Sequence, residues 1–354
     1  MRNLRKQLWR AGLAVAISMT LFIGPAYPCS RVLWNSNGQA VVVGRNMDWF
    51  EDMKTNLWVF PRGIERDGGA GKNSLKWTSK YGSLIASAYN IMTVDGINEK
   101  GLAVNPLWLA ESDYGKRDES VPGLSFTLAT QYFLDNFETV ADAVRFIETQ
   151  PFQVVTGPMG STNRIAAGHF ALADATGDSA VVEYIAGKPK IYHDRKYTVM
   201  TNSPPFDEQL ANLKQYKMFG GTKELPGSEQ SADRFVRAAR YLESLPKPTN
   251  KRETIAYLMS VMRNISAPFG ISDPLRPNIS ATRWRTVADL TKRVYYFEST
   301  ISPNVIWVFL DKLPLKEGSP VLKLDLVNDL DRSGNVTGQF KTSEPFEFRK
   351  VGVN

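Results

Sequence analysis

The sequence is poor in the residues that build metal sites and histidine-dependent active sites. It holds one cysteine, Cys29, and two histidines, His169 and His193, in 354 residues. One cysteine excludes an intrachain disulfide, and two histidines leave little material for a zinc site or for a nucleophile paired with a histidine base. We therefore expect no metal ion and no cofactor. The lone cysteine is either an inert buried thiol or a nucleophile that uses another base.

Long apolar runs are also scarce. The one from Leu13 to Ile23 is shorter than the roughly 20 residues needed to cross a bilayer. It follows a basic start without acids and ends in small residues (Arg2, Arg5, Lys6 and Arg10, then Gly24-Pro25-Ala26). This arrangement predicts a signal peptide over residues 1–28, and a periplasmic or secreted protein with no stable membrane anchor once that segment is removed.

The residues just before Cys29 bear on how this cysteine is exposed. Pro28 is poorly suited to signal peptidase, whereas cleavage after Ala26 fits its preference for small residues. That cleavage would leave Tyr27-Pro28 masking the α-amine of Cys29, and we expect attack by the Cys29 thiol on the Pro28 carbonyl to remove the dipeptide. A lipidated Cys29 on an exported, non-enzymatic binding protein is the rival interpretation, but the sequence before it lacks the small residues expected there.

Basic charge is concentrated in the same leading segment. The formal net charge is +7, and removing four cations with residues 1–28 leaves +3 for residues 29–354. No run of lysine and arginine interleaved with aromatic residues follows, so nucleic acid is not an expected partner. The remaining 326 residues can bury a large core, and no linker or repeat divides them. We expect a single domain over 29–354.

Hydrophobic periodicity predicts an α+β fold of antiparallel sheets faced by helices. Asn35 to Gly38, between apolar residues, predicts a hairpin at the start of the mature chain. Helices are expected over 124–137, 140–147, 231–245 and 254–262. Strands are expected over 169–174, 179–184, 188–193 and 197–201, as one antiparallel meander, and over 294–298, 305–310 and 320–326.

The hairpin brings Arg45 and Asp48 back toward Cys29. A cysteine at a free N-terminus carries a thiol with a reference pKa near 8.5 and an α-amine near 7.7 to 8.0, so one residue can supply nucleophile and base. Arg45 would stabilise the thiolate, and Asp48 would orient the α-ammonium. A surface ion pair near a strand end is the alternative for Arg45 and Asp48.

Several motifs occur in an order that resembles one enzyme family. They are Cys29-Ser30-Arg31, Gly44-Arg45-Asn46-Met47-Asp48-Trp49, Thr55-Asn56-Leu57-Trp58, Asp95-Gly96-Ile97-Asn98-Glu99-Lys100-Gly101-Leu102, Thr201-Asn202-Ser203-Pro204, Ser231-Ala232-Asp233-Arg234-Phe235-Val236-Arg237 and Thr282-Arg283-Trp284. The chain resembles the choloylglycine hydrolase family of N-terminal-nucleophile hydrolases, which includes penicillin V acylases and bile salt hydrolases. It looks most like the penicillin V acylases of Gram-negative bacteria.

This resemblance implies a four-layer αββα sandwich and hydrolysis of a small-molecule linear amide through a thioester on Cys29. By motif, Arg45 and Asp48 tune and orient the nucleophile, Asn202 donates to the oxyanion, and Arg234 supports the polar site. Trp108 stands where bile salt hydrolases tend to have a second oxyanion-hole asparagine.

Trp49 and Trp108 are candidate substrate-binding residues, which favours an aromatic or fatty acyl group over a steroid. Bile salt hydrolase and N-acyl-homoserine lactone acylase remain alternatives. The stretch between Asn202 and Arg234 is too short to hold the extended loop that many relatives use in tetramer assembly. The chain could still form a homo-oligomer.

Several of these residues also have plain structural interpretations. Asn202 precedes Ser-Pro-Pro and could be an ordinary turn residue. Arg234 and Arg237 have helical spacing and could form a solvated face, which is the preferred interpretation for Arg237. His169 is expected to be a structural histidine with satisfied hydrogen bonds, and His193, beside Asp194, is expected to be exposed.

Overall fold

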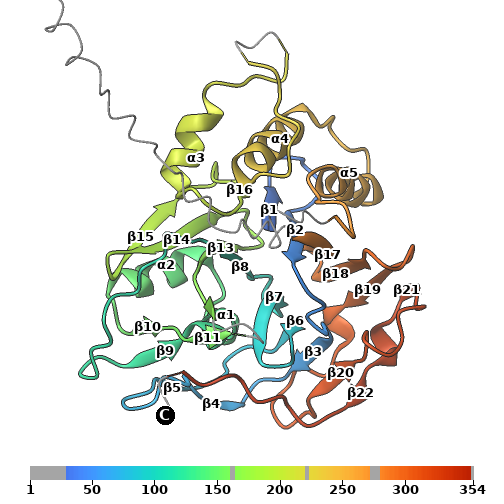
Figure 1. The fold of residues 1–354 in the computed structure, drawn as a ribbon. Helices are drawn as coiled ribbons and strands as arrows, with labels where there is room; N and C mark the ends of the chain where they lie inside the picture. Colours follow the sequence, from blue (N-terminus) through green and yellow to red (C-terminus); the bar gives the residue numbers. More distant parts are fainter. Residues whose placement is uncertain (1–28, 160–163, 220–222, 272–279, 352–354) are drawn as a thin grey trace, which may run out of the picture.

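The computed structural model describes residues 29–159, 164–219, 223–271 and 280–351. Two large sheets lie face to face, and helices cover the outer side of each (Figure 1). This confirms the predicted αββα sandwich. The predicted signal peptide and the Tyr27-Pro28 extension lie outside the described residues. No helix in the described ranges combines the length and apolarity that a membrane span requires.

The start of the described chain forms the second strand of the first sheet, counted from one edge. Its strand order is β16-β1-β2-β17-β18-β19-β21, antiparallel except for the β19–β21 pair. The strands are β1 (Cys29–Trp34), β2 (Val42–Trp49), β16 (Val199–Met200), β17 (Ala281–Asp289), β18 (Val294–Ser299), β19 (Val305–Phe309) and β21 (Gly334–Asn335). Helices α4 (Ser231–Ser244) and α5 (Lys251–Asn264) pack on β1, β2 and β17, and α3 (Phe206–Leu213) packs beside α4.

The second sheet faces the first across the core. Its order is β15-β14-β13-β8-β7-β6-β3-β20-β22. The strands are β3 (Leu57–Phe60), β6 (Ser83–Ala88), β7 (Met92–Asn98), β8 (Ala103–Trp108), β13 (Gly168–Ala173), β14 (Ser179–Ile185), β15 (Lys188–His193), β20 (Leu322–Leu324) and β22 (Lys341–Thr342). Helices α1 (Phe126–Asn136) and α2 (Val140–Glu148) cover its outer side.

Short elements complete the fold outside the two large sheets. Three two-stranded pairs are formed by β4 (Glu65–Asp67) with β5 (Lys76–Thr78), β9 (Gly123–Ser125) with β10 (Gln153–Val155), and β11 (Pro158–Met159) with β12 (Arg164–Ile165). Two single 3-10 turns, η1 (Leu310–Lys312) and η2 (Thr337–Gln339), follow β19 and β21.

The predicted hairpin and helices are confirmed. Asn37 closes the turn between β1 and β2 with its amide on the Trp34 and Ala40 carbonyls, and Gly38 takes a positive φ of 79° that favours glycine. Thr139 caps α2 by accepting a hydrogen bond from the Asp142 backbone. All four predicted helices are present within a few residues of their expected ends.

The predicted meander is wrong in its last strand. β13, β14 and β15 are consecutive neighbours in the second sheet, but β16 crosses to the first sheet and pairs with β1, with Arg31 opposite Met200. This crossing matters for the site, because Asn202 lies two residues after the end of β16. Strands β3, β6 and β7 were not predicted, since they are buried along their whole length and lack the alternation that marks a half-exposed strand.

Candidate active site

Cys29 begins β1, which lies between β16 and β2 in the first sheet; it is buried and pairs with Met47 of β2. Its Sγ atom lies 3.8 Å from the Asp48 carbonyl oxygen and 4.0 Å from Nη2 of Arg45. Burial raises the pKa of the thiol, and the positive charge of Arg45 opposes this without overcoming it. The raised pKa favours the protonated thiol, and in the 354-residue chain the Cys29 nitrogen is a peptide nitrogen and no base.

Arg45 lies on β2 with its guanidinium buried between the sheets. Nη2 faces the sulfur atoms of Cys29 and Met47, while Nε and Nη1 make no hydrogen bond among the described residues. Its charge acts on Asp95 of β7, a buried carboxylate on the opposite sheet that accepts hydrogen bonds from Thr286 at 2.7 Å and Tyr295 at 2.6 Å. Burial raises the pKa of Asp95, and the charge of Arg45 together with these hydrogen bonds opposes that shift.

Asp48 is the second-last residue of the same strand and is fully buried, with Thr282 of β17 as its cross-strand partner. Burial raises the pKa of Asp48 from 3.8 to about 6, although Arg234, the Thr282 hydroxyl and Arg45 oppose this shift. Both carboxylate oxygens lack a hydrogen bond of ordinary geometry within the described ranges. An unpaired buried carboxylate is costly, so a cation arriving beside Cys29 would be stabilised here.

Asn202 and Arg234 hold the backbone of Cys29 from the helical side. The Oδ1 atom of Asn202 accepts hydrogen bonds from the Cys29 backbone nitrogen and from Nη2 of Arg234 at 2.9 Å. Arg234, on α4, also donates to the Cys29 carbonyl and to the Ser30 hydroxyl. Arg234 is fully buried, so its interpretation as part of a solvated face is wrong. The β16 crossing makes this cluster possible.

A small apolar cavity opens beside the Cys29 thiol. Its volume is about 60 Å³, and Cys29, Arg45, Trp49, Trp108 and Met47 are among the residues that line it. The indole rings of Trp49 and Trp108 lie 6.4 Å apart. The Nδ2 atom of Asn202 donates to the Trp108 carbonyl at 2.8 Å, which places this amide beside the cavity wall. Ligand pockets usually measure about 300–1,000 Å³, so the walls must move when an acyl group enters.

Trp49 is held by a strained turn. Its Nε1 atom donates to the Tyr89 hydroxyl at 2.8 Å, and that hydroxyl donates to Glu51. Tyr89, Asn90 and Ile91 connect β6 to β7, and Tyr89 and Asn90 have positive φ of 51° and 50°. A left-handed conformation costs a residue such as tyrosine about 1–2 kcal/mol. The fold therefore keeps an unfavourable conformation that places this hydroxyl on Trp49.

His169 supports the far side of Asn202. Its Nε2 lies 2.7 Å from the Thr201 carbonyl oxygen, and its Nδ1 lies 3.0 Å from Oε1 of Glu183. Glu183 also accepts a hydrogen bond from the Phe206 backbone nitrogen. His169 is buried and paired, which confirms the prediction of a structural histidine, and His193 is exposed and lies 2.8 Å from Asp178.

The structure thus brings Cys29, Arg45, Asp48, Asn202 and Arg234 together, with Trp49 and Trp108 in the adjacent cavity wall. Within the described residues, no group of His, Cys, Asp and Glu side chains is arranged to hold a metal ion.

The supporting residues in this site were not predicted to have a role. Asp95 stood in a quoted motif, and only its position opposite Arg45 reveals what it does. Tyr89 gave no sequence signal, since its importance comes from the turn geometry. Arg237 was expected on a solvated face, and this is wrong because its guanidinium is largely buried and donates to the Pro226 and Ser228 carbonyls.

Fold and site together define an amide hydrolase with a buried cysteine at the start of its first strand. The chain belongs to the choloylglycine hydrolase family of linear amide C–N hydrolases, whose sequence profile matches residues 29–331. It is therefore an enzyme that hydrolyses linear carbon–nitrogen amide bonds.

Individual relatives agree with this assignment. A penicillin V acylase from Pectobacterium atrosepticum is 44% identical over 356 aligned residues, which cover 94% of this chain and 95% of the relative. The solved structure of penicillin V acylase from Agrobacterium tumefaciens is 50% identical, with a TM-score of 0.82 over 90% of this chain and 99% of that one. A variant of conjugated bile acid hydrolase from Clostridium perfringens shares the fold at 22% identity and a TM-score of 0.71 over 84% of this chain and 97% of that one.

Proposed function

We propose that this enzyme is an exported acylase that cleaves the side-chain amide of penicillin V, with Cys29 as its N-terminal nucleophile. The observation that carries the proposal is the Cys29 thiol at the end of an aromatic cavity, between Arg45 and Asp48. Removal of the preceding residues would convert the Cys29 nitrogen into an α-amine that can act as base. The small cavity between Trp49 and Trp108 suits a flat phenoxyacetyl group better than a steroid.

The proposed reaction uses the groups around Cys29 in sequence. The α-amine takes the thiol proton, the sulfur attacks the amide carbon, and the carbonyl oxygen becomes an oxyanion that Nδ2 of Asn202 stabilises. The amide nitrogen then leaves as an amine with the proton from the α-ammonium, and a thioester remains on Cys29. Water hydrolyses the thioester and releases phenoxyacetate, which regenerates the thiol.

The surrounding charges have distinct proposed roles. Asp48 binds the α-ammonium and fixes its direction, which explains why its carboxylate lacks a hydrogen bond of ordinary geometry while Cys29 is still preceded by a peptide bond. Arg45 stabilises the thiolate as it forms. Arg234 fixes the Cys29 carbonyl and the Asn202 side chain, so that nucleophile and oxyanion donor keep one relative position.

One purified sample assayed against three substrates tests the proposal. We expect kcat/KM to be higher for penicillin V than for glycocholate or a long-chain N-acyl-homoserine lactone. The reason is that the indole of Trp108 leaves room for a flat ring but narrows the cavity for a steroid. Equal or better turnover of glycocholate would contradict the substrate assignment, while activity in Cys29→Ala would contradict the mechanism.

A further inference from the structure

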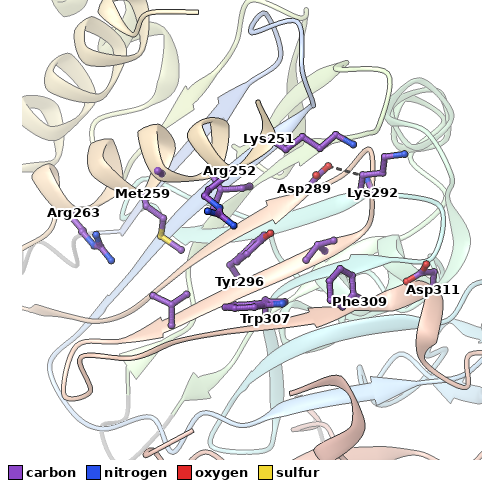
Figure 2. A pocket seen from close by; sticks show the side chains of 14 residues that line it. Lys251, Arg252, Met259, Arg263, Asp289, Lys292, Tyr296, Trp307, Phe309 and Asp311 are labelled. Atoms are coloured by element: carbon purple, nitrogen blue, oxygen red, sulfur yellow. Dashed lines mark hydrogen bonds between the residues drawn. The ribbon is translucent and has the colours of Figure 1, made fainter. Parts of the chain in front are cut away.

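A second concave site lies between helix α5 and the outer face of the first sheet, and none of its lining residues lines the Cys29 cavity. Its volume is about 710 Å³, within the usual range for small-molecule sites. Figure 2 shows aromatic side chains from the sheet on one side and basic side chains of α5 above them. The amide hydrolysis described above uses no residue of this groove.

The floor of the groove is aromatic. Along β19 the residues alternate between buried and half-buried, and Val305, Trp307 and Phe309 face the groove. Tyr296 of β18 is the direct cross-strand partner of Trp307, with ring centroids 6.0 Å apart. Half-exposed aromatic rings that lie side by side offer a surface on which a ring or hydrocarbon body can stack.

The rim of the groove is positively charged. Lys251 and Arg252 occupy the first turn of α5, where the helix dipole disfavours cations, and Lys292 lies in the turn between β17 and β18. None of the three forms an ion pair with another side chain that the structure describes. Arg263, at the other end of α5, is by contrast paired with Glu298 at 2.9 Å.

The acids of the groove offset only part of this charge. Asp289 is buried, accepts a hydrogen bond from the Lys292 backbone nitrogen at 2.9 Å, and is close enough to Lys251 and Lys292 for their charges to act on its carboxylate. Asp311 is exposed beside Phe309 (Figure 2). Four basic side chains thus line the groove with two acidic ones, which leaves an excess of positive charge, and three of the four cations form no side-chain ion pair among the described residues.

We propose that this groove is a second, non-catalytic binding site for an amphipathic organic anion. The ring or hydrocarbon body of the ligand stacks on Tyr296 and Trp307, and its carboxylate or sulfonate lies between Lys251, Arg252 and Lys292. Both parts of the site favour such a ligand, because desolvated aromatic rings gain from apolar contact and unpaired cations gain from a single bound anion.

The same charges argue against other occupants. A symmetric pair of copies joined through this face would bring each cationic rim close to its equivalent, and like charges repel. A flat lipid surface would meet the rim but would leave the concave aromatic floor uncovered. A small anion with an apolar body reaches both rim and floor.

Charge reversal at the rim, with a matched control, tests the proposal. The probe is 8-anilinonaphthalene-1-sulfonate, titrated by calorimetry into the full processed enzyme. Lys251→Glu/Arg252→Glu reverses two rim charges, and Lys214→Glu/Lys217→Glu makes the same change in net charge at exposed positions near the end of α3. We expect the rim variant to weaken binding about tenfold or more and the control to change it less than about twofold, since electrostatic attraction is strongest at short range.

A second variant addresses the floor. Trp307→Leu should weaken binding of the probe by a similar factor. The rate of amide hydrolysis should stay within about twofold of wild type, because neither Trp307 nor the rim residues line the Cys29 cavity. Equal affinities in rim variant and control would overturn the proposal. It would also be overturned if sedimentation showed an oligomer that only the rim variant dissociates, or if the rim controlled binding to phosphatidylglycerol vesicles without affecting the probe.

Discussion

Replacing Tyr89 by phenylalanine removes one oxygen atom from the support of the cavity wall. Trp49 loses the acceptor 2.8 Å from its Nε1 atom, and Glu51 loses its donor from the same hydroxyl. The ring and the strained turn stay in place, because phenylalanine has the same shape. Without the Tyr89 hydroxyl, the Trp49 side chain must be ordered when the substrate binds, which costs about 0.5–1.5 kcal/mol. This free energy corresponds to a KM about 2- to 12-fold higher.

The predicted signature of Tyr89→Phe is a split between KM and kcat. KM for penicillin V should rise within that range, whereas kcat should stay within about twofold because Cys29 and Arg45 are untouched. Release of the free amine product measures both constants. Tyr81→Phe is the matched control, since Tyr81 contacts Lys100 and does not line the cavity. An unchanged KM in Tyr89→Phe would refute the idea that this hydroxyl positions Trp49 for the substrate.

Three further predictions concern Arg45, Asp48 and the processing of the chain before Cys29. Arg45→Ala should lower kcat/KM by about 10²–10³, measured with penicillin V, because a preorganised cation is lost from a buried site, and a fall below threefold would contradict its role. The pKa of Asp48 is raised from 3.8 to about 6, so between these pH values the folded chain binds more protons than the unfolded chain. In chains with a peptide bond before Cys29, the free energy of unfolding should therefore fall as pH rises from about 4 to 6, by at most about 3 kcal/mol. Urea unfolding from pH 4 to 7 should show this fall, and Asp48→Asn should lack it; identical profiles would refute the assignment. If the Cys29 thiol attacks the Pro28 carbonyl and water then releases the dipeptide, the wild-type exported protein should begin at Cys29 and Cys29→Ala should retain Tyr27-Pro28. Intact-mass analysis measures both, and a Cys29→Ala protein without the dipeptide would assign the trimming to another protease.

Local patterns were sufficient for much of the fold. The β1–β2 hairpin follows from Asn35 to Gly38, because left-handed turn positions accept few residue types. The helices follow from apolar spacing and, for α2, from the Thr139 cap. Strands β3, β6 and β7 escaped prediction because both of their faces are buried, so their sequences carry no alternation. The crossing of β16 between sheets escaped as well, since no local pattern specifies which sheet a short strand joins.

The sequence by itself was enough to place Arg45 and Asp48 beside Cys29, the proposed nucleophile. A lone cysteine behind a signal-like segment, followed by Arg45 and Asp48 on the returning strand, needs only hairpin geometry to form a cluster. The order of the motifs also identified the family, which the profile match confirms.

The tertiary structure decided which distant groups complete the site and how charge behaves in it. Asn202 and Arg234 reach Cys29 across separations of 173 and 205 residues, and Asp95 influences Arg45 from the opposite sheet. Burial raises the pKa of both the Cys29 thiol and Asp48, an effect that sequence proximity to arginine does not reveal. Desolvation depends on everything that surrounds a group, and only the packed sheets and helices determine those surroundings.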